Sequence, residues 1–371
     1  MLNGPEVSPA LDDHSARQLL RHVPSGDIPP SADLQSSAAV ASALASRAAR
    51  PLDLLVGGDV MLGGRASSLV RAQGGAYPFA AVAPLMRSAR VVLANLEGPL
   101  ARKARREARR FSYRVAPESA SALADAGIGV VTLANNHLVD CGRAGVIETL
   151  ESLKECGVVA VGAGRNQETA HAPAIFRVPG GTLGILGYYW NRRCAATAQK
   201  PGSAMDDSES LERDIPALRR RVDLLVVTSH WGVPYERLPA EAERQRARRA
   251  IDLGADAVVA HHPHVVQPLE IYRGRPIFYS VGNFAFGSGN SRAEGLLVGF
   301  RLEPGVLEVE IHGLYVKNRD SRVSYQPKLL RGPSATRLLR RLHDPVGPDT
   351  AGLILEPDRA VLRLARSAAR C

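Results

Sequence analysis

Three histidines, His261, His262 and His264, stand within four positions, directly after the apolar run 257–260. That run predicts a buried strand of a parallel sheet, and Pro263 prevents the strand from simply continuing. The carboxyl ends of strands in open α/β sheets are where ligands bind, and neutral imidazole is a good ligand for zinc, iron and copper. A single histidine is more often a hydrogen-bonded core residue, but three at this place favour a metal site.

Four further predicted strands also end in side chains that can bind metals or transfer protons. After the predicted strands 52–56, 91–94, 129–134 and 223–229 these residues are, in chain order, Asp59, Glu97, Asn136 with His137, and His230. Each one alone could be a capping or core residue, and Asp59 could equally close its strand as an Asx turn. Five strands that deliver such residues at the same end favour one shared site.

The elements that must position these residues alternate between strand and helix. Helical patterns at 78–87, 117–126, 144–156 and 239–253 separate the strands, which predicts an α/β layered fold with right-handed crossovers. Further strands are predicted at 269–272, 276–280, 295–302 and 306–316, and a hairpin at 174–178 and 182–187. We therefore expect two packed sheets flanked by helices.

The chain is expected to hold one folded domain, 51–317, between two extensions. The leader 1–50 is rich in Ser, Ala and Pro without periodicity and is expected to be disordered. The extension 318–371 is arginine-rich with scattered leucines, and we expect one or two helices there, packed over the domain.

Composition narrows the class of protein. No window approaches the roughly 18 apolar residues of a membrane span, and no secretory signal is visible, so we expect a cytoplasmic protein. The four cysteines show no C-x-x-C spacing, which fits reduced thiols. The formal net charge is +10, but the basic residues are dispersed and no nucleic-acid motif is present. We therefore expect an anionic or peptide substrate and no nucleic acid.

The basic run 102–110 directly follows Glu97. Such a run is usually a solvated face. Its position beside the predicted site makes an electrostatic funnel for an anionic substrate the alternative.

Taken together, the motifs resemble the CapA family of poly-gamma-glutamate capsule biosynthesis proteins, a branch of the calcineurin-like metallophosphoesterases. The matching segments lie in the family's order within 52–316: GDVMLG at 58–63, NLE at 95–97, LANNH at 133–137 with Asp140 and Gly142, HWG at 230–232, HHPHV at 261–265 and YSVGNF at 279–284. The resemblance implies a four-layer fold, a two-sheet β-sandwich flanked by helices, with two metals at the strand ends.

The resemblance also implies residue roles. Glu97 stands where a carboxylate bridges the metals, and Asp59 and His264 serve one metal. The protein ligands of the other metal would be completed by Asn136, His230 and His262. His137 resembles the general acid or transition-state stabiliser of the superfamily.

Two departures from the superfamily pattern matter: Met61 stands where a histidine is usual, and Glu97 replaces an aspartate. We therefore expect one tight and one weak site, or a single metal. The mixed nitrogen and oxygen ligands suit Mn, Fe or Zn.

Such a site would lower the pKa of a bound water molecule and polarise a scissile group. His137 could protonate a leaving group. Asp140 either orients His137 or caps the helix expected from 144. Arg65 and Arg114 could bind a substrate carboxylate or phosphate in bidentate fashion, with a surface ion pair as the equal alternative.

Three functions remain open from the sequence. The leading hypothesis is a metal-dependent hydrolase linked to poly-gamma-glutamate or related peptide metabolism. The second is a metal-dependent peptide epimerase that removes the Cα proton. The third is a non-catalytic accessory subunit, associated with a complex for polymer synthesis or export.

Overall fold

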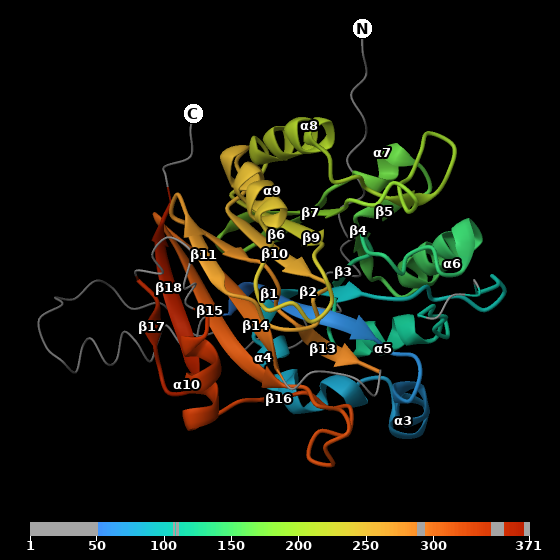
Figure 1. Ribbon diagram of the computed structural model, residues 1–371, viewed down its shortest axis with the longest axis horizontal. Helices are drawn as coiled ribbons and strands as arrows, with labels where there is room; N and C mark the ends of the chain where they lie inside the picture. The colour runs from blue at the N-terminus through green and yellow to red at the C-terminus, as the bar shows by residue number, and fades with distance from the viewer. Residues whose placement is uncertain (1–50, 107, 109–110, 288–293, 343–351, 367–371) are drawn as a thin grey trace, which may run out of the picture.

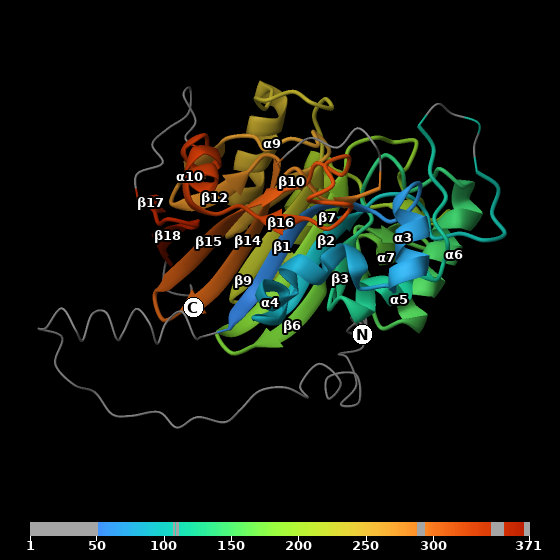
Figure 2. The ribbon, with the colours of Figure 1, turned by 90° about the horizontal axis from the view of Figure 1, so that it is seen from below.

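The computed structural model describes residues 51–106, 108, 111–287, 294–342 and 352–366. Two β-sheets pack face to face, and helices cover the outer face of each (Figures 1 and 2). The predicted leader 1–50 lies outside the described residues.

The larger sheet is parallel in one half and antiparallel in the other. Its strand order is β17-β18-β15-β14-β1-β2-β3-β4, with β13 paired to β1 and β16 to β15. The parallel half contains β1 (Leu52–Met61), β2 (Ala89–Leu96), β3 (Val130–Thr132), β4 (Val159–Val161) and β13 (Asn283–Phe286). The antiparallel half contains β14 (Glu294–Glu303), β15 (Val306–Tyr315), β16 (Lys328–Leu329), β17 (Ile354–Leu355) and β18 (Arg359–Ala365).

The second sheet carries the histidine-bearing strands. Its order is β11 (Leu269–Tyr272), β12 (Arg275–Phe278), β10 (Ala257–His261), β9 (Leu224–His230), β7 (Gly181–Tyr189) and β6 (Ala174–Val178). Strands β7, β9, β10 and β12 run parallel, and every residue of β9 and β10 is buried. Burial on both faces explains why these strands read as continuous apolar runs rather than as alternating ones. A small sheet pairs β5 (Ala163–Gly164) with β8 (Gly202–Ser203).

The helices complete four layers. The larger sheet is flanked by α3 (Ala66–Gln73), the 3-10 helix η1 (Tyr77–Val82), α4 (Ala83–Arg87), α5 (Ser119–Asp125) and α6 (Gly142–Glu155). The second sheet is covered by α8 (Ser208–Arg219) and α9 (Glu241–Asp252), beside the short α7 (Gln167–Ala170). The predicted α/β class and two-sheet sandwich flanked by helices are confirmed.

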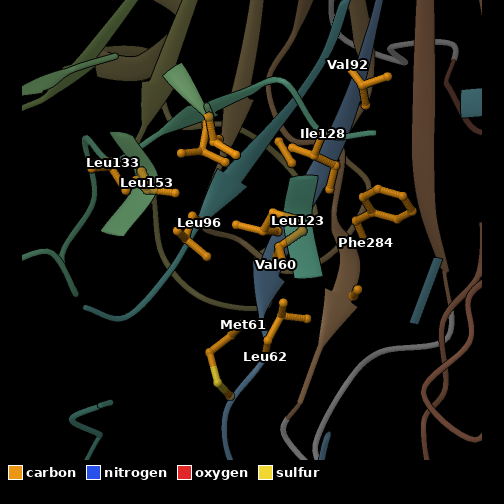
Figure 3. Packing of buried hydrophobic residues seen from close by; sticks show 14 of the residues in the cluster. Val60, Met61, Leu62, Val92, Leu96, Leu123, Ile128, Leu133, Leu153 and Phe284 are labelled. Carbon is orange, nitrogen blue, oxygen red and sulfur yellow. The ribbon is translucent and has the colours of Figure 1, made fainter. Parts of the chain in front are cut away.

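Three apolar clusters hold the layers together. Val56, Val226 and Val259 belong to the cluster between the sheets. Val60, Leu96 and Phe284 belong to the cluster on the helix side of the larger sheet (Figure 3). The third cluster joins the second sheet to α8 and α9. Val60 follows Asp59 and Leu96 precedes Glu97 in the chain. The backbone beside both carboxylates is therefore fixed by side chains in the hydrophobic core.

The C-terminal extension has a helix, as expected, but it also contributes strands that were not expected. Among the described residues it contributes one helix, α10 (Gly332–Arg340), and strands β16, β17 and β18 to the larger sheet. In β18, Ala360, Leu362 and Leu364 alternate into the core, while Arg363 pairs with Glu308 on β15 at 2.6 Å. This period of two, supported by a cross-strand ion pair, is the pattern of a strand.

No helix within the described residues is long and apolar enough to cross a membrane.

Candidate metal centre

The carboxyl ends of strands from both sheets meet at one site, in which Asn136, His262 and His264 are half-buried and the other residues are buried. The larger sheet contributes Asp59 on β1, Glu97 after β2, and Asn136 and His137 after β3; the second sheet contributes His230 at the end of β9, and His262 and His264 after β10. The structure thus brings together all seven of these residues, as their strands predicted.

Local backbone features turn these side chains towards the site. The register between β1 and β2 shifts between Val56 and Asp59, and that between β1 and β13 shifts between Asp59 and Val60. Such irregularities re-aim side chains at the ends of strands. After β10, His262 and His264 adopt φ values of 99° and 56°. Non-glycine residues held in this region of φ are strained, and they cluster at functional sites.

Asp59, Glu97 and His264 form the first group of ligand atoms. One ligand atom from each lies within 4.8 Å of the others. His264 Nδ1 is 2.9 Å from Asp59 Oδ2, and both carboxylates are fully buried. Two buried carboxylates this close need a cation between them or protons on them.

Asn136, His230 and His262 form the second group. Asn136 Oδ1 is 2.8 Å from His230 Nε2, and the rings of His230 and His262 have centroids 4.6 Å apart. The rings of His262 and His264 lie 6.0 Å apart, so the two groups are neighbours.

The donor atoms of the site fit a divalent metal. Within the described residues, Glu97 Oε2 and His262 Nδ1 are buried without a hydrogen bond. Such orphaned atoms cost free energy that coordination recovers. Carboxylate, amide and imidazole donors together suit Mn, Fe or Zn.

The protonation of the metal-free site follows from burial and charge. Burial raises the pKa of Glu97 to about 7, with the neighbouring Asp59 charge acting in the same direction. Burial alone would lower the pKa of His264, but the Glu97 charge and the contact with Asp59 outweigh it and raise the pKa to about 9.

The pKa values of the two histidines in the second group are lowered. Burial and the charge of His264 lower the pKa of His262 to about 4. Burial and the charge of His262 hold the pKa of His230 well below its ordinary value. The second group therefore offers neutral imidazole at neutral pH, the form that binds metals.

His137 stands at the edge of the first group and is held by Asp140. Its Nδ1 is 2.7 Å from Asp140 Oδ2, and its Nε2 is 3.9 Å from Glu97 Oε2. Asp140 also accepts a hydrogen bond from the backbone N–H of Tyr113 at 2.7 Å, and the Tyr113 ring lies 4.4 Å from the His137 ring. Helix α6 begins at Gly142 with Cys141 as its N-cap, so this geometry favours the orienting role of Asp140 over capping.

A layer of asparagines behind the ligands was missed by sequence reasoning. Asn95 Nδ2 donates to Asp59 Oδ1 at 2.8 Å and to Glu97 Oε1 at 3.2 Å. Asn135 Nδ2 donates to Asn95 Oδ1 at 3.1 Å, and Asn283 Oδ1 is 2.9 Å from His264 Nδ1. All three lie inside motif segments already recognised, and their positions at strand ends were the available signal. Such partners orient metal ligands.

Arg65 and Arg114 are exposed and outside the ligand cluster. They lie on neighbouring loops, because a Cβ added to Gly63 would lie 4.0 Å from the carbonyl oxygen of Arg114. Their role in substrate binding stays a prediction.

The basic run 102–110 is tied down at its start by Glu148 of α6, which accepts the backbone N–H groups of Arg102 and Lys103 at 2.8 and 3.0 Å. Residues 107, 109 and 110 of the run lie outside the described residues. After the run, Ser112 Oγ donates to the carbonyl oxygen of Asp140 at 3.4 Å, so the segment that begins at 111 borders the His137 side of the site.

Comparisons with known proteins show which proteins this chain is similar to. "PGA biosynthesis protein CapA" of Bacillus subtilis (strain 168) is 33% identical over 267 residues, covering 69% of this chain and 70% of that protein. "Probable polyglutamine synthesis accessory protein" of Mycobacterium tuberculosis (strain CDC 1551 / Oshkosh) is 32% identical over 184 residues, covering 46% of this chain and 48% of that protein.

Among solved structures, TT1561 of Thermus thermophilus aligns with 66% of this chain and 93% of its own, at 11% identity and a TM-score of 0.37. The family model described as "Bacterial capsule synthesis protein PGA_cap" matches residues 53–288, which contain every residue of the two ligand groups. The chain belongs to the bacterial capsule synthesis protein family PGA_cap, the CapA family.

Proposed function

We propose that this protein is a metal-dependent hydrolase that acts in poly-gamma-glutamate or related peptide metabolism. The observation that carries the proposal is the meeting of Asp59, Glu97 and His264 with Asn136, His230 and His262. The names of the two relatives, which refer to PGA and polyglutamine synthesis, support the substrate context.

In this proposal Asp59, Glu97 and His264 would hold one divalent metal (Mn, Fe or Zn), and Asn136, His230 and His262, together with Glu97, would hold a second. A metal bound there supplies Lewis acidity, which polarises the scissile group and acidifies water. Asn95 holds both carboxylates in place through its Nδ2.

His137 is the proposed acid–base residue. Its Nδ1 faces Asp140 at 2.7 Å, which leaves Nε2 directed at the ligand cluster. A proton on Nδ1 is retained by the carboxylate, so Nε2 is the atom that exchanges a proton with substrate. Tyr113 packs on the imidazole and limits its rotation.

Two other functions share parts of this evidence. An epimerase would use the same metal and a histidine base to move the Cα proton of a peptide. An accessory role, in association with a polymer-synthesis complex, is supported by the name of the mycobacterial relative.

One experiment separates the three. Metal-loaded protein is incubated in D₂O with γ-glutamyl oligomers and with a general phosphoester, and the products are analysed by mass spectrometry and NMR. Hydrolysis gives cleavage without deuterium at Cα, whereas epimerisation gives deuterium at Cα without cleavage. Folded, metal-loaded protein that does neither would contradict both enzyme functions and leave the accessory role. Glu97→Ala is the control, since it removes a residue shared by both metal positions.

A further inference from the structure

His261 is a buried histidine that belongs to neither of the two ligand groups. Its side chain is fully buried, and within the described residues neither of its ring nitrogens has a hydrogen-bond partner. A neutral imidazole can form two hydrogen bonds, so burying it with neither costs free energy that a structural role would not explain.

The fold aims this ring at the site. His261 is the last residue of β10, and its cross-strand partner on β9 is His230. Directly paired residues of neighbouring strands project from the same face of a sheet, and His230 projects into the second ligand group. The backbone is fixed there, because the His261 carbonyl accepts the N–H of Trp231 at 3.2 Å.

His261 reaches the first group through Asp59 only, since the ligand atoms that lie within 4.8 Å of one another belong to Asp59, Glu97 and His264. His261 Nδ1 is 3.5 Å from Asp59 Oδ1, while His264 Nδ1 approaches the other oxygen, Oδ2, at 2.9 Å. A separation of 3.5 Å is too long for a good N–H···O hydrogen bond. Two ligand atoms on one ion at about 2.1 Å and a tetrahedral angle lie about 3.4 Å apart.

We propose that His261 is a further ligand of the metal position built by Asp59, Glu97 and His264. That position then has two carboxylates and two imidazoles, which equals the four protein ligands of the other position. Neither position is weak, and the protein binds two divalent metals per chain. The inference rests on the proposed metal centre.

The test compares wild-type protein with His261→Ala, using Mn²⁺ and Co²⁺ as the metals. Metal per chain after dialysis, the dissociation constants and the visible absorption of the Co²⁺ form are measured. We expect two metals in the wild type and one in the variant, with the affinity of the lost position reduced more than about a hundredfold. That loss exceeds the tenfold to hundredfold typical of residues that only orient a ligand. The Co²⁺ spectrum should lose the contribution of that position.

His171→Ala is the matched control, because His171 is also a buried histidine but is bonded to Asp214 at 2.7 Å and to the backbone of Met205. It should keep both metals. If His261→Ala fails to fold, His261→Gln replaces it, since the amide preserves the volume and has a weaker donor.

Each outcome is decisive. A His261→Ala protein that keeps two metals overturns the inference. A smaller loss with an unchanged Co²⁺ spectrum also overturns it, because His261 would then only position Asp59. A wild type that binds no metal at all overturns the proposed function instead.

Discussion

At the scale of single residues, the proposed function assigns metal binding and proton transfer to different side chains. Asp59, Glu97 and His264 meet through their donor atoms, whereas His137 reaches the group only through Nε2 at 3.9 Å from Glu97. His137 is therefore placed to act on a substrate beside the metals without belonging to either ligand group.

Replacing His137 should thus lower activity without releasing metal. We expect His137→Ala to reduce kcat by about 10²–10⁴-fold, the usual contribution of general acid–base catalysis. Metal content should remain that of the wild type. Asp140→Asn should reduce kcat less and shift the pH profile, because the histidine keeps its place but loses the carboxylate on Nδ1. Steady-state kinetics and metal analysis of both variants check this, and loss of metal from His137→Ala would contradict it.

The two ligand groups should respond differently to pH. Metals bind the deprotonated ligand, and in the metal-free protein the pKa of His264 is raised to about 9 and that of Glu97 to about 7. Binding at the first group must release these protons, so its affinity should rise from pH 6 to pH 9. The pKa of His262 is lowered to about 4, so that ligand is already free in this range.

Calorimetric titrations with Mn²⁺ at several pH values, in buffers of different ionisation enthalpy, measure the protons released. We expect two sites, one whose Mn²⁺ affinity rises steeply with pH and one whose affinity changes little. Equal slopes, or an affinity that falls as pH rises, would contradict the assignment.

At the scale of elements, sequence reasoning succeeded where a strand carries its own signal. The apolar runs that precede Asp59, Glu97, His230 and His261 all became strands, since burial on both faces leaves a continuous hydrophobic run. The strands of the C-terminal extension were not predicted, because arginines interrupt the alternation of apolar and polar residues. Arg363 of β18 pairs with Glu308 of β15, and only the assembled sheet creates this pairing.

Contacts between distant strands also limited what the sequence could predict about the site. The resemblance supplied Asp59 and the other proposed ligands, and the fold brings them together. It gave no role to Asn95 or His261, whose environments depend on contacts between strands 36 or more positions apart in the chain.

The loop after β10 has a strained backbone at its proposed ligands. This strain predicts that a glycine variant there is more stable than an alanine variant. His262 has a φ of 99°, which glycine tolerates and alanine does not. In metal-free protein, we expect His262→Gly to be more stable than His262→Ala by about 1 kcal/mol. At His230, the last residue of β9, the order should reverse, because φ is not positive there and glycine loses more conformational entropy on folding than alanine. Denaturant unfolding of the four variants measures both differences, and the same order at both positions would refute the strain argument.

At the scale of the whole molecule, the centre joins the two sheets. Asp59 and Glu97 come from the larger sheet, and His262 and His264 from the second. A metal bound by these residues would tie together two layers whose shared apolar cluster includes Val56, Val226 and Val259.

Removing the metal should therefore destabilise the whole fold. A ligand at about 100 times its Kd stabilises a protein by about 2.7 kcal/mol. We expect chelation to lower the Tm by several degrees and re-addition of Mn²⁺ or Zn²⁺ to restore it, as followed by scanning calorimetry. Asp59→Asn should have a Tm that no longer responds to metal; a full response in that variant would argue against a centre between the sheets.

The most direct measurement is the metal content of the purified full-length protein by mass spectrometry, beside Glu97→Ala and His262→Ala. The account predicts about two divalent metals per chain in the wild type and a reduced content in both variants, most of all in Glu97→Ala. Folded wild-type protein that stays metal-free after incubation with Mn²⁺, Fe²⁺ and Zn²⁺ would contradict it.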